Sequence, residues 1–100
     1  MNQHGKARFQ LGTVVATPNA LTALEDSQEA AEVFLARHRA SDWGELSQED
    51  KDLNDAALVD GSRIFSAYRT CLGVKLWVIT ESADDQGNRA STCISLPEDY

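Results

Sequence analysis

Lys75-Leu-Trp-Val-Ile-Thr-Glu81 is the strongest strand signal in the chain, because it is rich in β-branched and aromatic residues. Another strand is predicted over Arg63–Thr70, and Leu72-Gly73 between the two suits the turn of a tight hairpin. A polar loop then leads to a last strand, Ala90–Leu96, which Pro97 ends. We therefore expect the C-terminal part of the chain to form an antiparallel sheet.

Before this hairpin, the apolar spacing predicts one further strand and three helices. The strand covers Phe9–Ala16, where apolar and polar residues alternate. Capping residues mark most helix ends: Thr17-Pro18 starts the first helix, Ser27 starts the second, and Ser47 and Gly61 bound the third. The second helix is expected to end near Ala40, because the residues 41–44 that follow are turn-forming. In the third helix, Leu53, Ala56 and Ala57 are expected to form the buried stripe.

The order β-α-α-α-β-β-β predicts an α+β fold with a four-stranded, mainly antiparallel sheet and an acidic helical block packed on one face. Residues 9–100 are expected to form one domain after a disordered tail over residues 1–8. No apolar run approaches the roughly 20 residues of a membrane span, and the polar N-terminus lacks a signal core. The predicted location is therefore cytoplasmic, with Cys71 and Cys93 as reduced thiols in strands.

Negative charge is concentrated in the helical region. The chain carries a formal charge of −7, yet eleven of its sixteen acidic residues lie between Glu25 and Asp60, together with only three basic ones. This region therefore has a formal charge of −8, and the rest of the chain is close to neutral. Such a region repels nucleic acid and presents an acidic surface to a basic partner.

We expect these carboxylates to bind a protein with a basic surface, such as a nucleic-acid-handling enzyme that the chain would inhibit. Helical spacing places Glu25, Glu29 and Glu32 in one row, and Trp43 would anchor the interface. The predicted contact residues are Glu29, Glu32, Asp42, Trp43, Glu45, Glu49, Asp52 and Asp55. Two other interpretations stay open: the acidic residues serve only solubility, and Trp43 fills the core.

The strongest strand also predicts a second surface. Trp77 and Ile79 alternate with Leu76 and Val78, so the two pairs point to opposite faces of the sheet. If helices cover the other face, Trp77 and Ile79 form an exposed apolar patch. This patch is a candidate dimer face, and a structural homodimer is an alternative function.

No catalytic residue, metal site or cofactor is predicted. His4 and His38 are too isolated for a metal site, and His38 is expected to be a hydrogen-bonded packing histidine on an apolar helix face. An alternative enzyme is a metal-independent ribonuclease resembling RelE and barnase-like toxins, in which cationic side chains stabilise phosphoryl transfer. Its candidate residues are Arg63, Tyr68, Arg69, Lys75 and Arg89. The pI of 4.6 argues against an enzyme that must approach a polyanion.

Six segments carry a resemblance to a known family and occur in this order: Phe9–Pro18, Phe34–His38, Asp42–Leu46, Arg63–Tyr68, Lys75–Glu81 and Leu96–Tyr100. Over nearly all of residues 9–100 the chain resembles a family of small bacterial proteins carried largely on plasmids and integrative elements. That family has no established activity, so the resemblance implies a mobile-element setting and assigns no catalytic residue. The chain departs from the family at Ser82–Arg89, where its loop is longer and more acidic.

Overall fold

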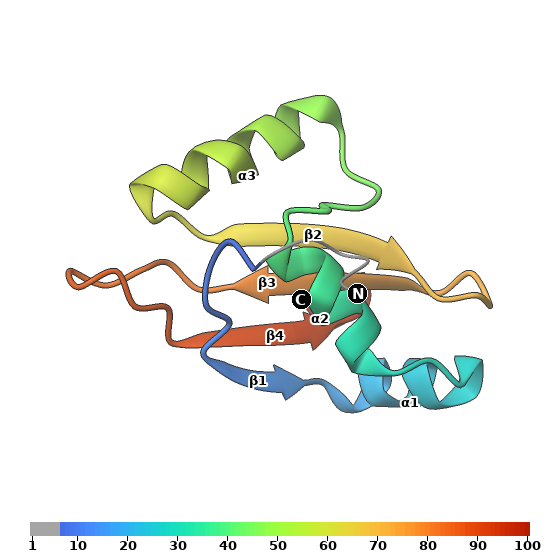
Figure 1. Cartoon of the computed structure of the whole chain (residues 1–100). Helices are drawn as coiled ribbons and strands as arrows, with labels where there is room; N and C mark the ends of the chain where they lie inside the picture. The colour runs from blue at the N-terminus through green and yellow to red at the C-terminus, as the bar shows by residue number, and fades with distance from the viewer. Residues whose placement is uncertain (1–6) are drawn as a thin grey trace.

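The computed structural model describes residues 7–100 and has the α+β architecture that the sequence predicts (Figure 1). The predicted tail over residues 1–8 lies mostly outside the described residues, and Arg8 donates its backbone N–H to the carbonyl of Arg39 at 2.7 Å. Among residues 7–100, no helix combines the length and the apolar composition needed to cross a bilayer. The elements are β1 (Thr13–Ala16), α1 (Pro18–Ser27), α2 (Ala31–Arg39), α3 (Gln48–Asp60), β2 (Ile64–Arg69), β3 (Lys75–Thr80), β4 (Ser91–Ser95) and a final 3-10 turn η1 (Pro97–Asp99).

The four strands form one mixed sheet in the order β1-β4-β3-β2. As predicted, β2, β3 and β4 pair antiparallel. The expectation of a mainly antiparallel sheet is wrong for β1, which pairs parallel with β4 and places Val14 opposite Thr92. A parallel pair requires a long crossover, which the helices and the hairpin supply, and the residues of a strand do not specify a partner so remote in the sequence.

β1 is shorter than the strand predicted over Phe9–Ala16. Gly12 has a φ of +65°, and a Cβ there would collide with the backbone oxygen of Ala90, so the chain bends before β1 begins. Phe9 consequently leaves the sheet. Its ring stacks on Trp43 with 6.2 Å between the ring centroids.

Most of the predicted turns and caps are confirmed. Thr17 and Ser47 each accept a backbone N–H at a helix start, and Gly61 ends α3 with a φ of +83°. Ser27, predicted to cap the second helix, is instead the last residue of α1, and its hydroxyl donates to the carbonyl of Leu24. α2 begins without a side-chain cap.

The hairpin between β2 and β3 turns at Leu72-Gly73 as predicted, with Gly73 at a φ of +84°. Both cysteines are free. Cys93 lies in β4 as expected, whereas Cys71 lies in this turn and not in a strand.

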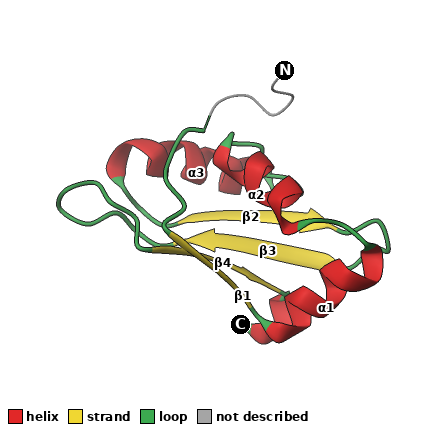
Figure 2. Ribbon diagram, turned by 60° about the horizontal axis from the view of Figure 1, so that its bottom comes forward, coloured by secondary structure: helices red, strands yellow, loops and turns green. Residues whose placement is uncertain are grey.

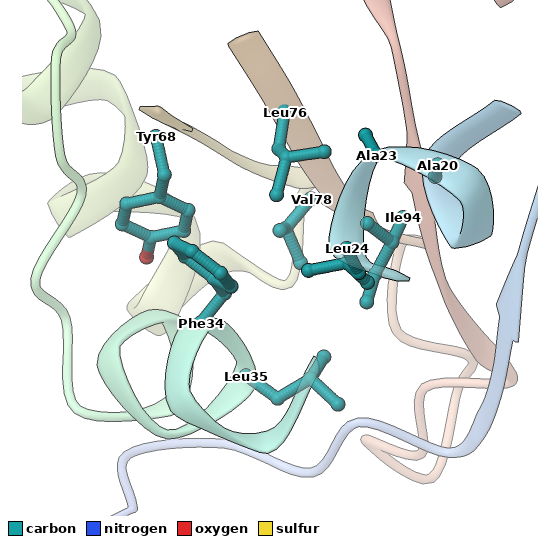
Figure 3. Packing of buried hydrophobic residues seen from close by; sticks show 9 residues of the cluster. All are labelled: Ala20, Ala23, Leu24, Phe34, Leu35, Tyr68, Leu76, Val78 and Ile94. Atoms are coloured by element: carbon teal, nitrogen blue, oxygen red, sulfur yellow. The ribbon is translucent and has the colours of Figure 1, made fainter. Parts of the chain in front are cut away.

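The helices pack their side chains against one face of the sheet, each over a different strand: α1 over β4, α2 over β3 and α3 over β2. Figure 2 shows α2 and α3 on the same side of the sheet. α1 and α2 enclose an apolar cluster with β2, β3 and β4, drawn in Figure 3. Its buried members are Ala20, Ala23, Leu24, Phe34, Leu35, Tyr68, Leu76, Val78 and Ile94.

α3 is attached differently, through a buried polar residue. Asn54 donates its amide to the carbonyl of Phe65 at 2.6 Å and accepts the N–H of Phe65 at 3.1 Å, so it pairs with β2 as a neighbouring strand would. Beside it, Ala57 packs on Trp43 and Ile64. The predicted buried stripe is therefore right only for Ala57, since the neighbouring Leu53 and Ala56 are exposed.

The outer border of β2 is covered by the segment before α3. Gly44 bridges Ala67 of β2, and Ala67 donates its N–H to the carbonyl of Trp43 at 3.2 Å. Gly44 has a φ of +76°, and a Cβ there would collide with the Ala67 carbonyl, so only glycine allows this approach. Together with Asn54, this segment satisfies much of the β2 border.

A chain of hydrogen bonds runs through the core from α2 to the sheet. The Leu11 carbonyl can only accept, so the Thr92 hydroxyl donates to it and accepts from Thr80. Thr80 must then accept from Nε2 of His38, which leaves Nδ1 to accept from the Ser66 hydroxyl. The network therefore holds His38 neutral with its hydrogen on Nε2, and the packing role predicted for His38 is confirmed.

Arg89 caps the C-terminal end of α3. Its guanidinium donates to the carbonyls of Ser62, Glu81 and Ala57 at 2.8, 3.0 and 3.1 Å. A cation favours the carbonyl end of a helix, where several backbone acceptors lack intrahelical partners. Burial lowers the pKa of Arg89, and its charge joins burial in lowering the pKa of His38 to about 3.

Candidate functional site

The acidic residues do not form one continuous helical surface. Glu25 belongs to α1, Glu29 lies between helices, and Glu32 belongs to α2, so the predicted row through these three is wrong. The reason is that Gln28 takes a left-handed conformation, with a φ of +58°, and ends the helix between them. In Figure 1, α1 and α3 lie at opposite borders of the sheet.

Several predicted contact residues have partners within the chain. Asp42 forms an ion pair with Arg37 at 2.7 Å, and Glu45 forms one with Arg69 at 2.9 Å. The Arg37 guanidinium lowers the pKa of Asp42. Glu29 accepts the backbone N–H of Cys71 at 2.9 Å, and this hydrogen bond lowers the pKa of Glu29. These carboxylates help to connect helices, loops and strands.

Trp43 is not a surface anchor. Only 4% of it is exposed, because it packs with Phe9, His38 and Ala57. Its indole N–H donates to the carboxylate of Asp55 at 3.0 Å, so this carboxylate of α3 has a partner in the core. The alternative interpretation, in which Trp43 fills the core, is confirmed.

The densest unpaired negative charge lies on the outward side of α3. This helix carries five acidic residues and Lys51, for a formal charge of −4. Among residues 7–100, none of the five forms an ion pair. Asp52, at the middle of the outward side, accepts the amide of Gln48 at 2.9 Å. The acidic residues of α3 are Glu49, Asp50, Asp52, Asp55 and Asp60.

Exposed apolar side chains lie among these carboxylates, and the sequence did not predict their exposure. Leu53 is 65% exposed and Val59 is 90% exposed, with the small Ala56 between them. The outward side of α3 consists of the exposed residues Glu49, Asp52, Leu53, Ala56, Val59 and Asp60. A signal was present: the apolar residues of α3 fall on more than one side of the helix, so they cannot all be buried.

The outward side is held in a fixed position. Ser47 accepts the N–H of Asp50 at 3.2 Å at the start of α3, and Gly61 and Arg89 close its end. Asn54 fixes the middle of the helix to β2. A surface held in this way loses little conformational entropy when it binds.

The other predicted surface, Trp77 and Ile79, lies on the sheet face turned away from the helices. Trp77 is half-buried, and Ile79 is only 4% exposed because it lies between Phe65 of β2 and Cys93 of β4 in the sheet. Ile79 is therefore not part of an exposed patch.

The five residues weighed for ribonuclease chemistry do not meet. Arg89 is buried against backbone carbonyls, and the Tyr68 hydroxyl donates to the carbonyl of Asp42 at 2.6 Å. Arg69 is paired with Glu45 and lies opposite Lys75, at the far end of β2 from Arg63. Within residues 7–100, no three metal-ligating side chains come together, and His4 lies outside that range.

Comparison of the chain with protein-family models, with curated proteins and with solved structures finds no match.

Proposed function

We propose that this chain is a non-enzymatic accessory protein of a mobile genetic element that binds a partner protein through the outward side of α3. The observation that supports this most is the combination, on one anchored helix, of unpaired carboxylates with exposed Leu53 and Val59. Apolar side chains supply contact area, while the carboxylates select a basic partner.

The partner is a protein with a basic groove that receives one face of a helix. A groove of this kind is typical of proteins that handle nucleic acid, and negative charge on α3 would occupy it in place of phosphates. Inhibition of such an enzyme is the narrower form of the proposal. Direct binding of nucleic acid is disfavoured by the formal charge of −7.

The first test is capture from a host-cell extract on the immobilised chain. A partner held by exposed charges is retained at about 0.1 M salt and released at about 1 M, because the screening length falls from about 10 Å to about 3 Å. The captured protein is then purified and its Kd for the chain is measured.

Matched variants locate the contact. Asp52→Lys should weaken binding by at least about tenfold, because it reverses a charge at the interface. Glu32→Lys makes the same change at an exposed position of α2 and should leave the Kd unchanged. Likewise, Val59→Ser should weaken binding, whereas Leu21→Ser on the exposed side of α1 should not. Equal effects within each pair would remove α3 as the binding element.

A further inference from the structure

The sheet face opposite the helices contains a cavity of about 260 Å³. Alternate residues of a strand point to opposite faces. Because Leu76 and Val78 point into the helix-covered core, Trp77 and Ile79 of the same strand point away from it. The lining residues are Arg63, Phe65, Trp77, Ile79 and Tyr100.

Three aromatic rings form the walls of the cavity. Phe65 meets Trp77 edge to face with 5.1 Å between ring centroids, and Trp77 meets Tyr100 in the same way at 5.8 Å. Ile79 is buried at the floor. A ligand ring placed against these side chains gains apolar burial and aromatic contacts.

One side of the cavity is polar and positively charged. Nη1 of Arg63 donates to the hydroxyl of Tyr100 at 3.2 Å. The hydroxyl accepts this bond and keeps its own hydrogen to donate, and the guanidinium keeps further N–H donors. Among residues 7–100, Arg63 forms no ion pair.

We propose that this cavity binds a small aromatic carboxylate. The ring lies among Phe65, Trp77 and Tyr100, and the carboxylate accepts hydrogen bonds from the Arg63 guanidinium and the Tyr100 hydroxyl. Known ligand pockets start at about 300 Å³, so this cavity suits a compound with one ring or two fused rings.

The Tyr100 wall is positioned by the residue before it. The Asp99 carboxylate accepts from the Thr17 hydroxyl at 2.6 Å and from the Asn19 amide at 2.7 Å, both at the start of α1. It also accepts the backbone N–H of Leu96 at 3.0 Å. Asp99 is thus a positioning residue: it touches no ligand but fixes the turn that carries Tyr100.

The probes are benzoate and indole-3-acetate, added to the full chain while the Trp77 indole N–H and the Ile79 methyl groups are followed by NMR. We expect saturable shifts with a Kd on the order of 1 mM, the affinity range of very small ligands. The neutral amides benzamide and indole-3-acetamide should bind at least about tenfold more weakly, since they lack the charge-assisted hydrogen bonds. Hexanoate, which has the charge without the ring, should also bind more weakly.

Variants separate the two parts of the cavity. Arg63→Gln should weaken benzoate binding by at least about tenfold. Lys75→Gln removes the same charge from the same face at the other end of the hairpin and should leave the Kd unchanged. Tyr100→Phe keeps the ring but removes the hydroxyl, and a several-fold loss is expected. Asp99→Ala should weaken binding while leaving the shifts of His38 and Asn54 in place, which shows that the core is intact.

Three results would overturn the proposal: amides that bind as tightly as the carboxylates, equal losses in Arg63→Gln and Lys75→Gln, or no saturable shift with either probe. A homodimer that closes this face, seen as a doubled mass that Trp77→Ser returns to monomer, would also overturn it. The cavity and α3 are on opposite sides of the sheet, so this proposal and the proposed function fail or hold separately.

Discussion

Over β3 and β4, α1 and α2 are held by close packing of apolar side chains, with Phe34 and Leu24 at the centre (Figure 3). Over β2, α3 is held by Asn54 and Arg89, which bond to backbone groups of the strands and the helix end. Burial of apolar surface is non-directional, whereas these hydrogen bonds require a defined geometry. Hydrogen-bond geometry, more than buried apolar area, therefore fixes the helix that we propose binds a partner.

The largest effect is expected where apolar packing dominates. Phe34→Ala should lower the free energy of unfolding by about 3–5 kcal/mol, because it removes a buried ring and leaves a cavity. Urea denaturation measures this loss. Leu21→Ala, on the exposed side of α1, serves as the control and should change stability by less than about 0.5 kcal/mol. A small loss in Phe34→Ala would mean that the apolar cluster is not the main source of stability.

The next effect tests the attachment of α3. Asn54→Ala should cost about 2–3 kcal/mol, since it removes two hydrogen bonds and leaves the N–H and C=O of Phe65 unpaired at the border of β2. Amide hydrogen exchange should become faster in α3 but not in α1. Uniform acceleration through both helices would contradict a separate attachment.

The smallest effect is a pH dependence from His38, whose pKa burial lowers to about 3. The unfolded histidine titrates near about pH 6.5, so between that value and the folded pKa only the unfolded chain binds the proton. The contribution of His38 to the free energy of unfolding is therefore complete well above pH 6.5 and is lost as the pH falls below that value. From pH 7.5 to 5 the loss should be about 2 kcal/mol.

Urea denaturation at the two pH values measures this slope, and His38→Gln supplies the control. Glutamine does not titrate, so the variant should show almost the same stability at pH 7.5 and 5, whatever its absolute stability. The carboxylates with lowered pKa values, such as Asp42 and Asp99, contribute their losses at more acidic pH. A flat curve for the natural chain would contradict a neutral, buried His38.

The parts of the fold that the sequence could predict are those written in local residue patterns. Thr17 and Ser47 at the helix starts, Gly61 after α3 and Gly73 in the hairpin each have one local conformational role. The strand over residues 75–80 follows equally from its β-branched and aromatic residues.

The remaining features depend on contacts between remote residues. A polar residue such as Asn54 is expected on the exposed side of a helix. It is buried because the backbone N–H and carbonyl of Phe65, at the border of β2, form hydrogen bonds with its amide. Leu53 is apolar and reads as buried, yet α3 turns it to solvent for the same reason. Arg89 reads as a loop cation, and its three carbonyl partners come from three separate segments. These contacts join residues that are far apart in the chain, so no local sequence pattern predicts them.

The candidate site was predicted in part. The sequence predicted the acidic character of the region, but not its division among helices, which follows from the end of α1 at Gln28. It placed Trp43 at an interface or in the core, and only the packing around Phe9 and His38 decides between the two. The aromatic cavity was missed because Tyr100 meets Trp77 only after the chain turns back beneath the sheet.

The bridge from Gly44 to Ala67 makes the two borders of the sheet unequal. On the β2 side the backbone is already engaged, whereas in the described part of the chain the outer side of β1 has no strand beside it. A strand from another molecule would therefore add more readily at β1 than at β2. Two molecules joined through β1 would leave only their largely engaged β2 borders exposed, which disfavours further edge-to-edge growth.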